Sequence, residues 1–450
     1  MLRIFNISGW WMPVLCVLVL FGGHFAIGAN TNALALLLAG LGFGLCLLSL
    51  AFIPRISWIL THRNFLIALL LFTITWLMLC LQLTMYLPGG AHPFWQWTSA
   101  PPVVTLDRDA TLRELIKLGA LGAVFVTGLV VGADDKRAML LFHLLILVGA
   151  LFAVWAFVEY ITQANLAVRG NVQSHLRLTA GFLSANSAAA LFGMLCILSL
   201  AAVLRSAKQI VGENSKLMAF IEHLIRNAPV AIIALLFTLT SLLFTASRGG
   251  VLACLVAISV FAVWEIVGLK GSKNSGSKII GVFFLAFILM VLIFLNSSEL
   301  VVDRLDGTSA SAENRWQIMS AHWQAFLAAP WTGYGLGTFY LINDMSMNAQ
   351  NWGALRDNGA VHNVYLQWLE EAGIIGTALM FTTIGFILWV MYRGLRLRRR
   401  MRTWIKAILC ISILLLLHGT VDYGLQIPSL AMMWALLLGT GFGLGTKRPD

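Results

Sequence analysis

One histidine and three arginines stand out in this sequence because each lies in a short motif at the edge of an apolar segment. They are His362 in VHNVYL (361–366), Arg177 in RLTAGF (177–182), Arg248 in TASRGG (245–250) and Arg315 in ENRW (313–316). An imidazole titrates near neutral pH and can take a proton from an attacking sugar hydroxyl. A guanidinium stays charged and presents a fork of donors that matches phosphate oxygens, so several arginines together can clamp a diphosphate.

Structural explanations for the same residues stay open at this point. An arginine at a helix end often reaches the lipid headgroups, and an isolated histidine is more often structural, as we expect for His24 and His143. The glycine pair after Arg248 favours binding there, since small residues let a ligand approach the backbone. His362 is preferred because it lies on the same expected membrane face as the arginines. By that test the weaker candidates are His175, His322 and His418.

Metal and nucleotide chemistry have weaker signals. Asp303 and Asp306 lie three residues apart and could share a cation, but one such pair in a polar loop is a poor signal. The segment GYGLG at 333–337 lacks the Lys-Ser/Thr ending of a nucleotide site. All six cysteines fall inside apolar segments, so structural disulfides and zinc sites are not expected. The sequence therefore predicts no metal site and no cofactor.

The elements that position these residues are membrane helices. The chain is 59% hydrophobic and only 11% charged, whereas about a quarter of the residues of soluble domains are charged. A helix that crosses a bilayer takes about 20 residues. Apolar segments near that length occur at 10–28, 33–53, 65–83, 114–133, 138–161, 184–204, 229–246, 249–269, 279–295, 372–392, 404–420 and 428–445. We therefore predict an all-α bundle of about 12 transmembrane helices that forms a single integral membrane domain over residues 1–450.

Charge sets the expected orientation. With the N-terminus in the cytosol, most of the 30 Lys and Arg residues fall on the cytosolic side, as the positive-inside rule requires. Both termini are then cytosolic, and the segments 84–113, 162–183 and 296–371 face outward. The net charge of +11 follows from this bias and is weak evidence for nucleic-acid binding.

The outward segment 296–371 is the longest polar stretch of the chain. Loops of this length are usually functional or disordered, and this one is rich in tryptophan. Its apolar residues between 314 and 329 recur at helical spacing. Pro330 ends that helix, and the glycines at 333–337 form a turn. A second helix is expected to begin near Asn363, which places His362 at the mouth of a membrane helix.

Taken in order, these motifs resemble those of the bacterial O-antigen ligase and polymerase superfamily. The resemblance covers about residues 170–380 and rests on RLTAGF with SAN (177–186), SRGG (247–250), RW with PWTGYG (315–335), and HNVYL with EAGIIG (362–376). One departure is Ser184-Ala185-Asn186, where relatives often have Asn-Pro-Asn, so a role for Asn186 stays open.

The resemblance implies a metal-independent, inverting glycosyltransferase of GT-C-like architecture in the bacterial inner membrane, with its site on the periplasmic face. Such enzymes pass a glycan from an undecaprenyl-diphosphate carrier to an acceptor hydroxyl. Carried over by motif, His362 would activate the acceptor, and Arg177, Arg248 and Arg315 would hold the diphosphate. The implied partners are the lipid-linked glycan donor, a glycan or lipid A core acceptor, membrane lipids and a candidate chain-length regulator.

The acceptor and the class of protein are left open by the sequence. A polymerase joins repeat units, whereas a ligase moves the chain onto a lipid A core. Protein oligosaccharyltransferases of the same superfamily commonly carry an additional outward domain, and we expect this chain to end in the cytosol at Asp450 without one. The competing class is a transporter or flippase of lipid-linked glycans, although transporters place ionisable groups near the midplane. A structural scaffold would not account for the tryptophan-rich loop.

Overall fold

The computed structural model describes residues 9–53, 61–162, 177–208, 217–267 and 299–446. Within these ranges the regular elements are helices and no strand occurs, so the predicted all-α class is confirmed. The α-helices are α1 (Trp11–Phe25), α2 (Asn32–Phe52), α4 (Arg63–Cys80), α5 (Arg108–Gly132), α6 (Asp135–Thr162), α7 (Ala185–Ala207), α8 (Leu217–Asn227), α9 (Pro229–Phe244), α10 (Arg248–Val267), α12 (Glu299–Ala328), α13 (Phe339–Ser346), α14 (Trp352–Leu355), α15 (Val364–Gly394), α16 (Arg402–His418) and α17 (Pro428–Thr446). Short 3-10 helices are η1 (Ile27–Ala29), η2 (Leu81–Leu83), η3 (Pro93–Trp97) and η5 (Gly424–Gln426).

Eight helices in the described part of the chain are long and apolar enough to cross a membrane, namely α2, α4, α5, α6, α7, α10, α15 and α17. The chain is therefore a multi-pass membrane protein. Two further apolar helices, α1 and α9, are shorter, with 15 and 16 residues. The apolar segment predicted to span at 279–295 lies outside the described residues, so the count of about 12 spans stays a prediction.

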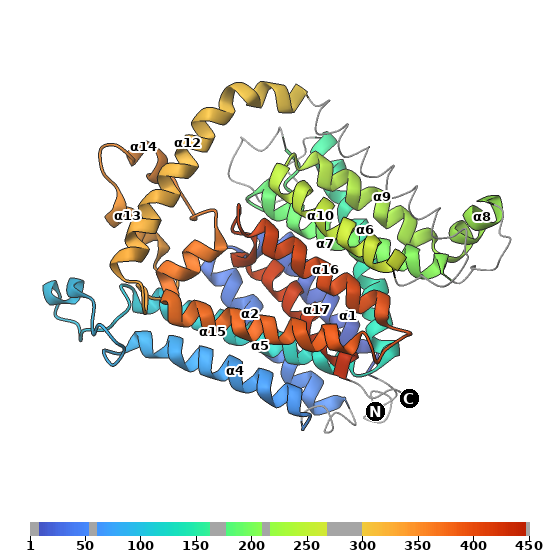
Figure 1. The fold of residues 1–450 in the computed structure, drawn as a ribbon, viewed down its shortest axis with the longest axis horizontal. Coiled ribbons are helices and arrows are strands. Elements are labelled where there is room, and N and C mark those ends of the chain that lie inside the picture. Colours follow the sequence, from blue (N-terminus) through green and yellow to red (C-terminus); the bar gives the residue numbers. More distant parts are fainter. Residues whose placement is uncertain (1–8, 54–60, 163–176, 209–216, 268–298, 447–450) are drawn as a thin grey trace.

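The helices lie on two sides of α16 and α17 (Figure 1). Helices α4, α5 and α15 lie on one side, and α7, α9 and α10 lie on the other. The segment from α12 to α14 projects at one end of the bundle, where it contacts α15. The motifs that contain Arg177, Arg248 and His362 come together at this end, because α7, α10 and α15 all begin there.

Helices α5 and α17 are in backbone contact. A Cβ atom added to Gly128 would lie 2.2 Å from the carbonyl oxygen of Leu436, and one added to Gly439 would lie 2.0 Å from the carbonyl oxygen of Phe125. Small residues permit such close approach, which is a common way for membrane helices to associate. This contact fixes α17 and, with it, the short loop that precedes it.

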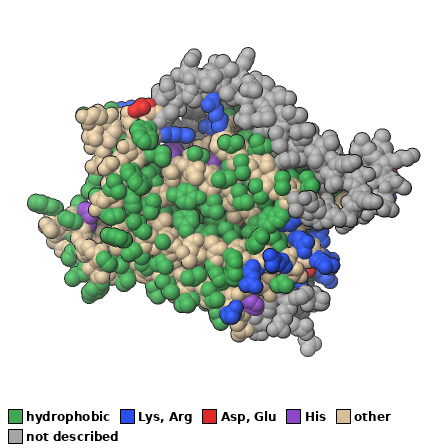
Figure 2. Space-filling model, in the orientation of Figure 1, with side chains coloured by type: hydrophobic (Ala, Val, Ile, Leu, Met, Phe, Trp, Pro, Cys, Tyr) green, Lys and Arg blue, Asp and Glu red, His purple; other side chains and the backbone are tan. Residues whose placement is uncertain are grey.

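The end of the bundle away from α12–α14 is basic. Figure 2 shows a broad hydrophobic surface, with Lys and Arg side chains gathered where α15 ends and α16 begins. Glu265 of α10, which is 2% exposed, pairs there with Lys208 and with Lys406 at 3.3 Å. Arg398 pairs with Asp135 at the start of α6. These ion pairs connect α7, α10 and α16 at the basic end.

The chain that follows α12 enters a break in α15. The predicted helix at 314–329 forms the last part of α12, which ends two residues before Pro330. At Gly373 the backbone has φ 66° and ψ −178°, and the N–H of Ile374 donates to the carbonyl of Pro330 at 2.8 Å. A side chain at Gly373 would collide with the carbonyl oxygen of Trp331, 2.3 Å from its Cβ position. The turn at 330–337 therefore packs into the break in α15.

Candidate active site

His362 lies directly before α15 in a left-handed backbone conformation with φ of 57°. As predicted, a helix begins next to Asn363, whose side chain accepts two backbone hydrogen bonds of 3.0 Å from its first turn. The N–H of Val364 donates to the carbonyl of Gly419 at 2.8 Å, which ties this segment to the end of α16. The His362 side chain is 29% exposed, so a substrate can reach it.

A carboxylate that sequence reasoning missed lies beside His362. Asp422 occupies the short loop between α16 and η5, and its Oδ1 lies 3.8 Å from Nδ1 of His362. This distance fits an ion pair rather than a hydrogen bond. Burial alone would raise the pKa of Asp422, but His362, His418 and the amide of Asn186 outweigh it and hold the pKa below its usual range. Asp422 is therefore an anion that faces the imidazole.

Asn186 and Arg177 extend this contact away from His362. Nδ2 of Asn186 donates to Oδ1 of Asp422 at 3.0 Å, and Nη2 of Arg177 donates to Oδ1 of Asn186 at 3.1 Å. Nε of Arg177 donates to the carbonyl of Thr245 at 2.8 Å, so the guanidinium is fixed from two sides. Asn186 lies in the first turn of α7, and its N–H is capped by Ser184. The structure thus links Arg177 to the carboxylate next to His362.

Arg248 is the first residue of α10 and lies against the same loop. Oγ of Ser247 accepts a hydrogen bond of 3.3 Å from the N–H of Gly250, which starts the helix. A Cβ atom added to Gly249 would lie 2.8 Å from the side chain of Val421, and one added to Gly250 would lie 3.5 Å from Nε2 of His418. The two glycines therefore let α10 approach the loop that carries Asp422. The Arg248 side chain is exposed at this point.

Unusual backbone conformations gather in these motifs. Five non-glycine residues of the described chain have positive φ, and three of them are Ala180, Ala246 and His362, at 50°, 49° and 57°. Each such residue costs about 1–3 kcal/mol and persists only where the surrounding structure holds it. The three lie just before α7, α10 and α15, which indicates a site assembled from the starts of these helices.

Arg315 is the predicted site residue that the structure does not bring into this assembly. It lies on α12 with an exposed side chain. In the described residues no hydrogen bond or ion pair joins it to Asp422, Asn186 or His362. Its part in holding a diphosphate stays a prediction.

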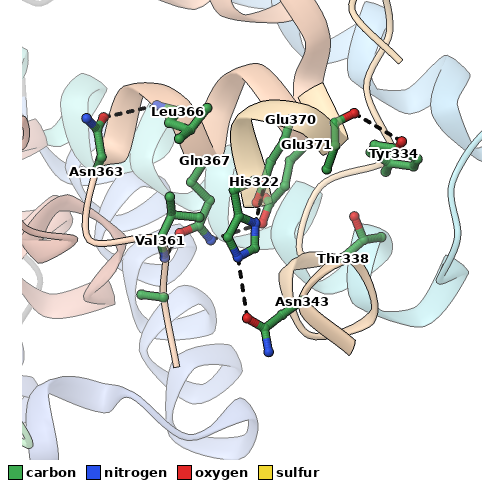
Figure 3. A network of polar contacts seen from close by, with 12 residues as sticks. His322, Tyr334, Thr338, Asn343, Val361, Asn363, Leu366, Gln367, Glu370 and Glu371 are labelled. Atoms are coloured by element: carbon green, nitrogen blue, oxygen red, sulfur yellow. Dashed lines mark hydrogen bonds and ion pairs between the residues drawn. The ribbon is translucent and has the colours of Figure 1, made fainter. Parts of the chain in front are cut away.

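A second polar network, buried between α12, α13 and α15, holds the outward segment in place (Figure 3). Nδ1 of His322 lies 2.7 Å from Oε2 of Glu370, and both side chains are fully buried. Nε2 of His322 lies 3.4 Å from Oδ1 of Asn343, whose amide donates to the carbonyl of Leu355 at 2.9 Å. The His322 ring also stacks on Phe339 at 5.1 Å between centroids. These contacts hold the His322 ring in the interior of the outward segment.

This network reaches the backbone of His362 through Gln367 (Figure 3). Oε2 of Glu371 accepts from the N–H of Gly337 at 2.8 Å, and Oε1 of Glu371 accepts from Nε2 of Gln367 at 3.0 Å. Oε1 of Gln367 in turn accepts from the N–H of Val361 at 3.5 Å. Because Val361 is fully buried and directly precedes His362, the turn after α12 helps to set the position of the imidazole.

The described part of the chain holds no group of three or more His, Cys, Asp and Glu side chains arranged to bind a metal ion. The side chains of Asp303 and Asp306 lie outside the described residues, so that pair stays untested. The six cysteines are free, without disulfides.

Comparison with known proteins agrees with the motifs. Residues 233–381 match the family model described as O-antigen ligase. The match covers about a third of the chain and includes Arg248, Arg315 and His362, but it reaches neither Arg177 nor Asp422. A search of proteins with curated annotation found no match.

Proposed function

We propose that the chain is an enzyme of the O-antigen ligase and polymerase superfamily, whose family model matches residues 233–381, and that it transfers a glycan from undecaprenyl diphosphate to an acceptor hydroxyl. Ligases and polymerases of this superfamily are glycosyltransferase-like enzymes of polysaccharide biosynthesis. The observation that carries the proposal is the continuous set of contacts from Arg177 through Asn186 and Asp422 to His362. It provides a fixed positive charge and an oriented base at the same end of the bundle.

His362 acts as the general base in this proposal. Its Nδ1 faces Asp422, so Nε2 is the atom that takes the proton of the acceptor hydroxyl. The acceptor oxygen bonds to the anomeric carbon while the bond from that carbon to the diphosphate oxygen breaks, and the electron pair leaves with undecaprenyl diphosphate. Asp422 orients the imidazole and stabilises the imidazolium that forms.

Arg177 and Arg248 stabilise the departing diphosphate. Charge-assisted hydrogen bonds from guanidinium groups are strong, and charge fixed before the reaction costs no reorganisation during it. Hydrogen bonds to Asn186 and Thr245 fix Arg177 in this way, whereas Arg248 is exposed at the start of α10. Arg315 is proposed as a third ligand on the strength of its motif alone.

The proposed reaction inverts the anomeric configuration and uses no metal or nucleotide. A diphosphate is already a good leaving group, so the site chiefly needs positive charge and a base. Attack by the acceptor on the face opposite the diphosphate inverts the anomeric carbon in one step. Retention of configuration in the product, measured by NMR of the anomeric proton, would refute this mechanism.

We also propose an inner-membrane location, with both termini in the cytoplasm and His362 on the periplasmic face. The basic end around α15 and α16 lies away from α12–α14 and His362, which supports this orientation under the positive-inside rule. Labelling of single cysteines introduced next to His362 and next to Arg398 with a membrane-impermeant reagent in intact spheroplasts tests it. Labelling next to Arg398 alone would reverse the orientation.

The function is tested with purified protein in vesicles that contain an undecaprenyl-diphosphate-linked glycan. Two acceptors are supplied separately, a lipid A core and a second lipid-linked repeat unit, and the release of undecaprenyl diphosphate is followed. Elongation of the repeat identifies a polymerase, and transfer to the lipid A core identifies a ligase. Absence of release with both acceptors would refute the proposal and favour a transporter.

A further inference from the structure

Two cavities of similar size lie side by side in the half of the bundle that holds α4, α5 and α15. One is polar, with a volume of about 380 Å³, and its walls include Glu114, Lys117, Gln367, Glu371, Tyr423 and Gln426. The other is apolar, with a volume of about 400 Å³, between α4, α5, α15 and α17. Leu118, Leu121, Trp368, Leu425 and Ala431 line both of them, so the two cavities adjoin.

The polar cavity has the chemistry of a sugar site. Its described walls carry the carboxylates of Glu114 and Glu371 and one ammonium group, that of Lys117, which pairs with Glu114. No arginine lines it within the described residues. Carboxyl groups, amides and phenols exchange hydrogen bonds with the hydroxyl groups of a saccharide.

The polar cavity also reaches the catalytic end. Tyr423 lines it, and the ring of Tyr423 meets the ring of His362 edge to face, with centroids 5.4 Å apart. Gly359, three residues before His362, lies on the same wall. A saccharide in this cavity can therefore present a hydroxyl group toward His362 from the side of Tyr423.

The apolar cavity can take a hydrocarbon chain that enters from the lipid. Its walls are aromatic and aliphatic, among them Phe72, Phe381 and Ile384. Leu69 and Thr73, which also line it, have exposed side chains on α4. The cavity therefore opens toward the surface of the bundle that faces hydrocarbon.

The arginines line neither cavity, although Leu183 of the segment that carries Arg177 reaches the polar one. Arg177 and Arg248 belong to the starts of α7 and α10, and no described residue of α7, α9 or α10 lines either cavity. In Figure 1 these helices lie across α16 and α17 from α4. His362 and Asp422 stand between an arginine side and a cavity side, which gives two substrates separate approaches.

We propose that the two cavities together bind the acceptor, with its saccharide in the polar cavity, its polyprenyl chain in the apolar cavity and its diphosphate at their junction near Lys117. This inference rests on the proposed function and makes it more specific. The single apolar cavity of about 400 Å³ has room for one lipid chain, as in a lipid-linked repeat unit. Lipid A carries several acyl chains, which this cavity does not accommodate. The chain is then a polymerase, with donor and acceptor lipids on opposite sides of α16 and α17.

The experiment uses matched substitutions on α4 in the reconstituted protein. The donor is a sugar-labelled glycan chain on undecaprenyl diphosphate, and the concentration of unlabelled undecaprenyl-diphosphate-linked repeat unit is varied as the acceptor. Thr73→Trp fills the apolar cavity from its open side. The control is Ile74→Trp, because Ile74 is 42% exposed on the same helix and does not line the cavity.

Thr73→Trp should raise the acceptor KM about tenfold, the effect of excluding about two methylene groups from a binding site. The donor KM should not change, and Ile74→Trp should stay within about twofold of wild type for both substrates. A higher donor KM with an unchanged acceptor KM would assign the cavity to the donor chain and overturn the proposal. No change in either KM would indicate that bulk membrane lipid occupies the apolar cavity, which would also overturn the proposal.

A second measurement uses the wild-type protein and so does not depend on the folding of a variant. An acceptor with a photoreactive diazirine in its polyprenyl chain should label peptides of α4 and α15 that line the apolar cavity, at 65–73 and 380–387. Labelling confined to α9 and α10 would overturn the proposal. Transfer by the wild type to lipid A core alone would refute this inference and leave the proposed function standing, whereas absence of transfer to both acceptors would refute the proposed function itself.

Discussion

Oδ1 of Asp422 lies 3.8 Å from Nδ1 of His362, although the whole of α15 and α16 separates the two residues in the sequence. The Asp422 side chain is 1% exposed and the His362 side chain is 29% exposed, so the carboxylate is enclosed and the imidazole is accessible. A buried anion behind an accessible imidazole orients the ring. This relationship supports the proposal that His362 is the general base.

Replacement of Asp422 tests this relationship directly. Asp422→Asn keeps the size of the side chain and removes its charge, so the imidazolium loses its counter-charge. We expect kcat to fall by about 10²–10⁴-fold, the usual contribution of general base catalysis, with little change in the donor KM. Initial rates of undecaprenyl diphosphate release at saturating acceptor measure this. Wild-type turnover in Asp422→Asn would remove Asp422 from the mechanism.

The same substitution should lower the stability of the folded protein by an amount that depends on pH. Because the folded protein holds the pKa of Asp422 below its usual range, the ionised carboxylate stabilises the folded state above the unfolded pKa of about 4. That stabilisation is lost as the pH falls through the lower folded pKa. The difference in Tm between wild type and Asp422→Asn should be constant at neutral pH and shrink below about pH 4. A difference that grows on acidification would contradict the direction of the shift.

Replacement of His362 and of His322 should distinguish a catalytic histidine from a structural one. His362→Ala should abolish glycan transfer and leave the Tm close to that of wild type, because the His362 side chain is partly exposed. His322→Ala should lower the Tm, because it leaves Glu370 buried without its partner and opens a cavity beside Phe339. A cost of about 2–5 kcal/mol is usual for such losses. Equal loss of Tm in both variants would show that His362 is structural. His143→Ala, at an exposed position of α6, serves as the control.

Arg177 should not tolerate replacement by lysine. Its guanidinium donates through Nε to the carbonyl of Thr245 and through Nη2 to Asn186, and an ammonium group cannot reproduce that planar pair. We expect Arg177→Lys to lower kcat/KM for the donor by about 10²-fold or more. Arg315→Lys is the comparison, because Arg315 is exposed on α12 and a lysine there keeps the charge. If Arg315→Lys lowers the donor kcat/KM more than Arg177→Lys does, the diphosphate binds chiefly at α12.

Much of the fold could be predicted from local sequence. Apolar segments marked α2, α4 and the other long helices because burial in lipid demands about 20 apolar residues in succession. Asn363 before a helical pattern marked the start of α15, since an N-cap residue has a local signature. Contacts between helices were not predictable, because they depend on which small residues meet. The packing of Gly128 against Leu436 is one example.

The candidate site was predictable only where its residues lie in motifs. His362, Arg177 and Arg248 each have such a motif. Asp422 does not, because a single acidic residue in a short loop has no periodic pattern and its partners lie on α7 and before α15. The available signal was a carboxylate in a short polar interruption between two apolar segments, where a charge is costly without a partner.

The break in α15 at Gly373 provides the last test, because it separates the effect of backbone shape from that of side-chain chemistry. Gly373 has φ 66° and ψ −178°, a region that only glycine adopts readily, and a Cβ atom there would lie 2.3 Å from the carbonyl oxygen of Trp331. Gly373→Ala should therefore destabilise the protein by at least about 2 kcal/mol. It should also lower kcat, because the displaced turn at 330–337 holds His362 through Glu371 and Gln367.

The control is Gly385→Ala in the same helix, where an added Cβ meets nothing within 4 Å. Alanine favours a helix over glycine by about 1 kcal/mol, so this variant should be as stable as wild type or more so. Thermal unfolding and the rate of glycan transfer in the two variants measure both effects. If Gly373→Ala unfolds like Gly385→Ala and keeps full activity, the turn does not depend on the break, and the position of His362 must be fixed by its contacts with α16 and Asp422 alone.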